Sequence, residues 1–167
     1  MWPRRCSTGC GVDFSAVDFP RERVVWWQMD QGQPVKIMIV EDQSDWLVKH
    51  ERQLREKGID DITTANSVEQ AIRLIQENDF TAVLADGLDG LYFKIVEAAQ
   101  VKQGTRVIVI SAREPKEEAQ FGQEVSSTGG EFINKDKFGN PGYETEYKNL
   151  AESLKGQAGR SKEAPVF

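Results

Sequence analysis

Cysteine and histidine are scarce in this sequence of 167 residues, and their scarcity excludes several kinds of site. The two cysteines are Cys6 and Cys10, and the one histidine is His50. A zinc site normally needs four ligands, so a lone CxxxC pair with a distant histidine does not predict one. We interpret the cysteines as unpaired thiols. We expect His50 at the surface or boundary of a helix.

Long apolar runs and an excess of basic charge are also missing. No apolar stretch approaches the roughly 18 residues that a membrane span needs. Lysine and arginine total 21 against 27 aspartates and glutamates, for a net charge of -6 and a pI of about 5.0. Nucleic-acid binding needs clustered positive charge. Arg4 and Arg5 have no apolar core behind them, so they do not form a secretory signal. We expect a cytoplasmic protein with neither nucleic-acid binding nor membrane insertion.

Residues 1–28 differ from the rest of the chain, because they mix Pro, Gly, Cys and Arg without a sustained period. We expect a leader that is disordered or not natively translated, with Met29 as the natural start. The alternative is a docking segment that uses the contiguous apolar residues at 24–27. Residues 29–155 are expected to form one domain, and residues 156–167 a flexible tail.

From residue 36 onward, short apolar segments alternate with helical patterns. The longer apolar runs lie at 36–42, 81–86, 106–111 and 131–135. A short strand is expected at 62–65. Such runs are typical of strands buried on both faces of a parallel sheet, joined by crossover helices. We expect an α/β domain with the flavodoxin-like (βα)5 fold: a parallel five-stranded sheet of order 2-1-3-4-5 with helices on both faces.

Local signals mark the ends of the expected helices. Ser44 can cap a first helix that stops at Gly58. The sequence Ser67-Val-Glu-Gln has the pattern of a capping box. A polar helix is expected over 114–125, and an amphipathic helix closes the domain from Tyr143 onward.

The longer apolar runs each end in polar residues, and these should meet in space. They are Glu41 with Asp42, then Asp86, Ser111 and Lys135. Ligands of parallel sheets bind outside the carboxyl ends of the strands. Carboxylates there suit Mg²⁺, and Asp86 can also act as a nucleophile that forms an acyl phosphate. Lys135 and the Ser111 hydroxyl can then contact phosphoryl oxygens. The pattern predicts a site for a cation and a phosphoryl group.

This set of residues resembles the receiver (response-regulator) domain of bacterial two-component signalling. The resemblance covers residues 36–155. In receivers an acidic pair follows strand 1, the phosphoacceptor Asp ends strand 3, a Ser or Thr before a small residue ends strand 4, and a Lys ends strand 5. The corresponding residues here are Glu41-Asp42, Asp86, Ser111-Ala112 and Lys135. Receivers also carry an aromatic switch residue three positions before the lysine, where this chain has Phe132.

The resemblance implies a phosphoprotein with Mg²⁺ as its cofactor. Asp86 would accept the phosphoryl group from a phosphohistidine of a histidine kinase or phosphotransfer protein. Asp42, Asp86 and the Leu88 backbone carbonyl would bind the ion, and Glu41 would act on it through water. The apolar Leu88 side chain cannot orient an attacking water, so we expect slow loss of the phosphoryl group, with Arg113 as a complicating neighbour.

The resemblance also implies a signalling switch. Phosphorylation would draw Ser111 inward, and Phe132 would follow. The signal would leave by contact with a downstream protein of unknown identity, and pairing of two copies of the chain is left open. The protein would not be an enzyme beyond its own phosphorylation and dephosphorylation.

Departures from the receiver pattern keep other interpretations open. The loop at 86–90 is shorter than usual, Asp136 stands where a Pro usually follows the lysine, and the helix over 114–125 is polar. A trans peptide is expected before Asp136. The short loop and the missing Pro prompt one alternative, a degenerate receiver that binds partners without phosphorylation. A remote alternative is a phosphatase of the haloacid-dehalogenase type, prompted by Asp86 and Asp89.

Overall fold

The computed structural model describes residues 34–102 and 104–158. The expected leader at 1–28 lies outside these residues, as do the two cysteines and the apolar segment at 24–27. Most of the tail expected at 156–167 lies outside them as well. The last described helix runs to Ala158, three residues past the expected end of the domain.

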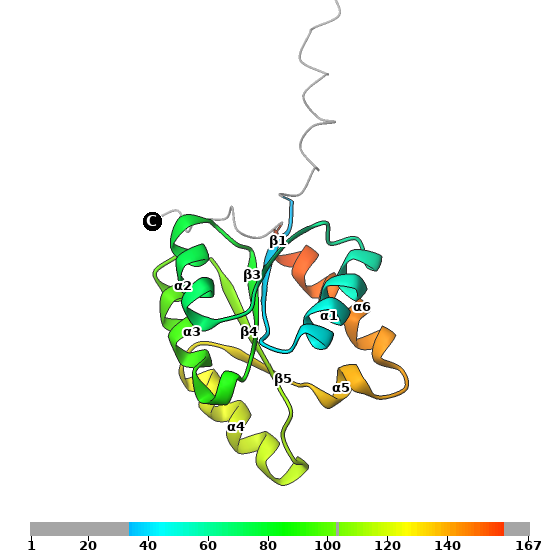
Figure 1. The fold of residues 1–167 in the computed structure, drawn as a ribbon. Coiled ribbons are helices and arrows are strands. Elements are labelled where there is room, and N and C mark those ends of the chain that lie inside the picture. Colours follow the sequence, from blue (N-terminus) through cyan, green and yellow to red (C-terminus); the bar gives the residue numbers. More distant parts are fainter. Residues whose placement is uncertain (1–33, 103, 159–167) are drawn as a thin grey trace, which may run out of the picture. The chain divides into compact units, whose positions relative to one another are not determined.

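The described residues form a five-stranded parallel sheet (Figure 1). The strands are β1 (Lys36–Val40), β2 (Asp61–Ala65), β3 (Ala82–Asp86), β4 (Arg106–Ser111) and β5 (Glu131–Asn134). Their order in the sheet is β2-β1-β3-β4-β5. The predicted flavodoxin-like fold and strand order are therefore confirmed.

Helices cover both faces of this sheet, as Figure 1 shows. The larger ones are α1 (Ser44–Glu56), α2 (Val68–Glu77), α3 (Tyr92–Gln100), α4 (Pro115–Ser127) and α6 (Tyr143–Ala158). The described residues also form two short elements, the 3-10 turn η2 (Leu88–Gly90) and helix α5 (Asp136–Gly139). Among residues 34–102 and 104–158, no helix combines the length and apolar character that a bilayer crossing requires.

Two hydrophobic clusters form the core, one on each face of the sheet. Met38 and Val40 of β1 belong to the cluster that packs under α2, α3 and α4. Ile37 and Ile39 belong to the cluster under α1, α5 and α6. Successive side chains of a strand point to opposite faces, so a strand covered on both faces must be apolar throughout. The core thus accounts for the unbroken apolar runs of the sequence.

The helix ends agree in part with the signals in the sequence. The Ser67 Oγ accepts a hydrogen bond from the Gln70 amide (3.2 Å), and the Gln70 side chain accepts one from the Asn66 amide (3.0 Å). This confirms the cap at Ser67. The predicted cap at Ser44 is wrong, because the Gln43 carbonyl already accepts the first helical bond, from the Leu47 amide at 3.0 Å. Ser44 is therefore inside α1.

His50 differs most from expectation. Its side chain is buried between α1, α5 and α6, with 2% exposure, not at the surface. The Nδ1 atom shares a hydrogen bond of 2.8 Å with the Tyr147 hydroxyl. The ring stacks against Trp46 and meets Phe138 edge to face. The Tyr147 hydroxyl on α6, distant in sequence, offsets part of the cost of burying this polar ring, whose Nε2 has no hydrogen-bond partner among the described residues.

Candidate functional site

The carboxyl ends of β1, β3, β4 and β5 meet at one edge of the sheet. Glu41 and Asp42 follow β1, Asp86 and Ser111 end β3 and β4, and Lys135 follows β5. Their neighbours pair in register, Val40 with Ala85 and Ser111 with Asn134. A pocket of about 420 Å³ opens here, and its lining includes Asp86, Ser111 and Lys135. The structure thus brings the predicted polar residues together.

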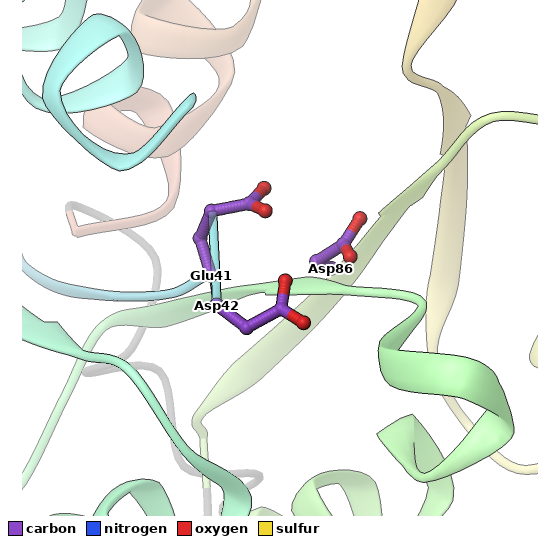
Figure 2. A group of neighbouring side chains, drawn as sticks. All are labelled: Glu41, Asp42 and Asp86. Atoms are coloured by element: carbon purple, nitrogen blue, oxygen red, sulfur yellow. The ribbon is translucent and has the colours of Figure 1, made fainter. Parts of the chain in front are cut away.

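Three carboxylates gather at this edge (Figure 2). One oxygen each of Glu41, Asp42 and Asp86 lies within 4.8 Å of the others. Figure 2 shows these side chains at the ends of β1 and β3. Glu41 is buried, whereas Asp42 is exposed. Asp89 is exposed in η2 and is not part of this cluster.

Lys135 connects two of these carboxylates. Its Nζ donates to Glu41 Oε2 at 2.7 Å and to Asp86 Oδ1 at 3.1 Å. The lysine side chain is 7% exposed, so little water screens the contacts. Such charge-assisted bonds are strong, and removal of one partner would leave a buried charge. The lysine therefore stands where it can reach a group attached to Asp86.

The charges at this edge of the sheet affect the ionisation of Glu41. Burial raises the pKa of Glu41, and the Asp86 carboxylate raises it further, while the hydrogen bond from Lys135 works in the opposite direction. The net effect favours the neutral form of Glu41, mainly because of burial, even with the Lys135 ammonium in contact. An additional positive charge at this edge would favour ionised Glu41.

Ser111 and Gly87 lie in close contact beside Asp86. Ser111 is buried, with 5% exposure. A Cβ built on Gly87 would stand 2.4 Å from Ser111 Oγ. No side chain fits there, so the glycine lets the backbone after Asp86 approach the serine hydroxyl.

The turn after β3 has an unusual backbone. Leu88 and Asp89 both have positive φ, 46° and 51°, and residues other than glycine rarely adopt such values. The Leu88 carbonyl accepts a hydrogen bond from the Leu91 amide (2.9 Å), which leaves its second lone pair for another partner. Strain of this kind gathers at functional sites.

A short helix takes the place of the usual proline after the lysine. The Asn134 side-chain oxygen accepts a bond from the Asp136 amide (3.1 Å), and α5 begins at that residue. The described part of the chain contains no cis peptide, so the bond before Asp136 is trans as expected.

Trp46 and Arg113 also line the pocket. The sequence had suggested Arg113 as a neighbour of the phosphoryl group but had not assigned Trp46 to the site. The Arg113 guanidinium lies over the Phe121 ring, 4.1 Å from its centroid. The Lys135 Nζ lies 4.9 Å from the centre of the Trp46 ring. A tryptophan in an amphipathic helix predicts only core packing. The sequence therefore carried no signal for the contact between Trp46 and Lys135.

Phe132 lies apart from the pocket. Its ring meets Phe121 edge to face, with centroids 5.1 Å apart. It also lines a separate groove of about 580 Å³ beside α4. The structure places the expected switch residue next to α4 and does not place it against Asp86.

Neither a protein-family model nor a curated protein matches this chain. Solved structures do match it. A response regulator receiver domain protein from Clostridium thermocellum has 19% identity and a TM-score of 0.61, over 77% of this chain and 97% of its own. The receiver domain of the Francisella response regulator 1452 gives the same identity and TM-score over 77% and 99%.

A third match was solved with ligands bound. The response regulator protein TrrA from Thermotoga maritima, in complex with Mg(2+)-BeF, has 20% identity and a TM-score of 0.56, over 72% of this chain and 98% of its own. At such identities the likeness shows a common fold. With its strand order of β2-β1-β3-β4-β5, this chain has the fold of response regulator receiver domains.

Proposed function

We propose that this protein is a phospho-aspartate receiver that acts as a signalling switch. The observation that carries the proposal is the Lys135 Nζ within 3.1 Å of Asp86 and 2.7 Å of Glu41. An acid with a lysine and a buried hydroxyl beside it has what a phosphoryl acceptor requires: a nucleophile and groups that bind the transferred oxygens.

The donor set fits Mg²⁺. This ion prefers oxygen ligands, often one or two carboxylates with retained waters, and three carboxylate oxygens lie within 4.8 Å of one another here. We assign Asp42, Asp86 and the Leu88 carbonyl to direct contacts and Glu41 to a contact through water. When bound, the ion would offset negative charge on the acceptor and on the incoming phosphoryl group.

The chain's own residues would perform the transfer. A carboxylate oxygen of Asp86 attacks the phosphorus of a phosphohistidine, forming a P–O bond while the P–N bond breaks and its electron pair returns to the imidazole. Lys135 contacts one phosphoryl oxygen, and the Ser111 hydroxyl donates to another. The phosphoryl donor is a histidine kinase or a phosphotransfer protein.

Phosphorylation would change the surface of the protein beside α4. Movement of Ser111 toward the phosphoryl group would free space for Phe132, which now packs on Phe121 of α4. The signal would pass to a downstream protein by contact. Nucleic-acid binding, membrane insertion and independent enzyme activity are not part of the proposal, and the location proposed is cytoplasmic.

The phosphoryl group should be lost slowly. Leu88 is two positions beyond Asp86 and packs against the core, so it offers no polar group to orient an attacking water. A lifetime of only seconds at neutral pH would contradict this part of the proposal.

Intact-mass measurement tests the function directly. The full chain is incubated with acetyl phosphate and Mg²⁺ beside Asp86→Asn, with Asp89→Asn as the matched control. We expect one phosphate adduct on the wild type and on Asp89→Asn, but none on Asp86→Asn.

The same experiment separates the alternatives. If the wild type and Asp86→Asn both stay unmodified, and beryllofluoride with Mg²⁺ does not change the melting temperature, the protein is a degenerate receiver. Turnover of a generic phosphate ester would favour a phosphatase instead.

A further inference from the structure

Trp46 is the aromatic neighbour of the lysine at the candidate site. It is half-buried in the first turn of α1, and its ring centre lies 4.9 Å from the Lys135 Nζ. It also lines the pocket that Asp86 and Ser111 share. A cation over an indole face is attracted by the ring, and more strongly where water is excluded.

The position of Trp46 is held by its neighbours. The His50 ring stacks on it with centroids 5.5 Å apart and an interplanar angle of 29°. The Lys49 Nζ lies 4.6 Å from the indole centre and donates to the Phe138 carbonyl of α5 (2.6 Å). On the α5 side, a Cβ on Gly139 would come within 3.7 Å of the ring. Contacts from two helices therefore fix the indole.

These contacts surround the segment that directly follows Lys135. Helix α5 begins at Asp136, the residue after Lys135, and packs against α1 through Trp46 and His50. The orientation of the Lys135 side chain thus depends on its contact with Trp46 of α1 in addition to its two carboxylate partners.

We propose that Trp46 is a positioning residue: it holds the Lys135 ammonium toward Asp86 and shields it from water. The inference rests on the proposed phosphoacceptor function and adds to it a residue that touches neither the metal nor the phosphoryl group. Of these two side chains, Lys135 contacts the transferred group, and Trp46 acts through it.

The first test is kinetic and uses the full chain. Phosphorylation by acetyl phosphate with saturating Mg²⁺ is compared in wild type, Trp46→Leu, Trp46→Phe and Leu47→Ala. Leu47 packs against the same core cluster as Trp46 and controls for lost packing. We expect Trp46→Leu to be about three- to tenfold slower, and Trp46→Phe, which keeps an aromatic face, to stay within about twofold.

Leu47→Ala should lose stability yet react at nearly the wild-type rate. A Trp46→Leu protein as fast as wild type would overturn the proposal. So would a Trp46→Phe protein as slow as Trp46→Leu, because then only the indole's bulk or fit would matter.

The second test does not depend on phosphorylation. The chain has four tryptophans, and after 5-fluorotryptophan labelling the ¹⁹F resonance missing from Trp46→Phe identifies Trp46. We expect Lys135→Gln to shift this resonance by more than its linewidth, and Lys148→Gln on α6 to leave it in place.

The two tests also separate failure of the inference from failure of the proposed function. If the wild type takes up no phosphate, the function fails, and the ¹⁹F comparison alone decides whether Trp46 holds Lys135. An unmoved Trp46 resonance in Lys135→Gln overturns the inference in either case.

Discussion

Gly87 shows how much the candidate site depends on single residues. It directly follows Asp86, and a Cβ at this position would stand 2.4 Å from Ser111 Oγ and 2.9 Å from Ser111 Cβ. The glycine has an ordinary negative φ of -60°, so its role is to leave space and not to permit an unusual backbone. Its absent side chain lets the backbone after Asp86 pass close to the Ser111 hydroxyl.

Gly87→Ala should therefore damage the site and the fold together. We expect a loss of about 1–3 kcal/mol in the free energy of unfolding, because either Ser111 or the backbone must move. Phosphorylation should slow as well, since the hydroxyl is displaced from its place beside Asp86. Urea unfolding and intact-mass kinetics measure the two effects.

Gly156→Ala is the matched control. Gly156 lies in α6 with open space around it, so alanine there should leave stability unchanged or raise it by up to about 1 kcal/mol. Equal stability losses in the two variants would show that the contact with Ser111 does not matter.

At this scale the sequence identified the residues at strand ends but not those that reach the site from elsewhere. Glu41, Asp42 and Asp86 could be found because a parallel sheet brings its carboxyl ends together. Trp46 and Gly87 could not, because their roles depend on contacts with Lys135 and Ser111 that no local pattern encodes.

At the scale of elements, the packing of α1 against α5 and α6 has a buried histidine at its centre. The pKa of His50 is lowered from 6.5 to about 4, and burial is the main cause. The Lys135 and Lys49 ammonium groups act in the same direction, and the Asp86 carboxylate opposes them. The folded state therefore favours the neutral ring.

The free energy of unfolding should therefore decrease as the pH is lowered, and the decrease should depend on His50. The unfolded chain takes up a proton near pH 6.5 and the folded chain near pH 4, so the stabilisation is present above pH 6.5 and is lost as the pH falls toward 4. Between about pH 7 and about pH 5 the loss should be about 1–2 kcal/mol.

Chemical unfolding across this pH range checks the prediction, with His50→Gln as the comparison. The difference in slope between the two proteins isolates His50 from the acidic residues that titrate in the same range. Parallel curves for wild type and His50→Gln would contradict a buried neutral histidine.

Prediction of elements from the sequence succeeded where the pattern was long. The apolar runs marked the strands, the capping box marked the start of α2, and the amphipathic pattern marked α6. It missed α5 and η2, because elements of four and three residues are too short to show a period. It also misplaced His50, since its partner Tyr147 lies on another helix.

At the scale of the whole molecule, the proposed Mg²⁺ site at one edge of the sheet would link stability to divalent cations. The carboxylates of Glu41, Asp42 and Asp86 lie close enough to repel one another when ionised, and a divalent cation would reduce that repulsion. A ligand that binds the folded state alone stabilises it in proportion to the logarithm of its concentration above Kd.

Mg²⁺ should therefore raise the melting temperature of the full chain, and a chelator should reverse the rise. At tenfold excess over Kd the gain should be about 1.4 kcal/mol. Asp42→Asn should abolish most of it, whereas Glu152→Gln on the exposed face of α6 should not. A gain of the same size in both variants would point to a general charge effect over an acidic protein.

The outer strands of the sheet limit how this protein can associate with others. Strand order leaves β2 and β5 at the outside. These strands are five and four residues long, and each begins with an exposed acid, Asp61 or Glu131. Short strands that carry charge are poor templates for a strand from another chain. The backbone of the sheet is thereby protected from uncontrolled addition of strands, and recognition is left to helices and loops.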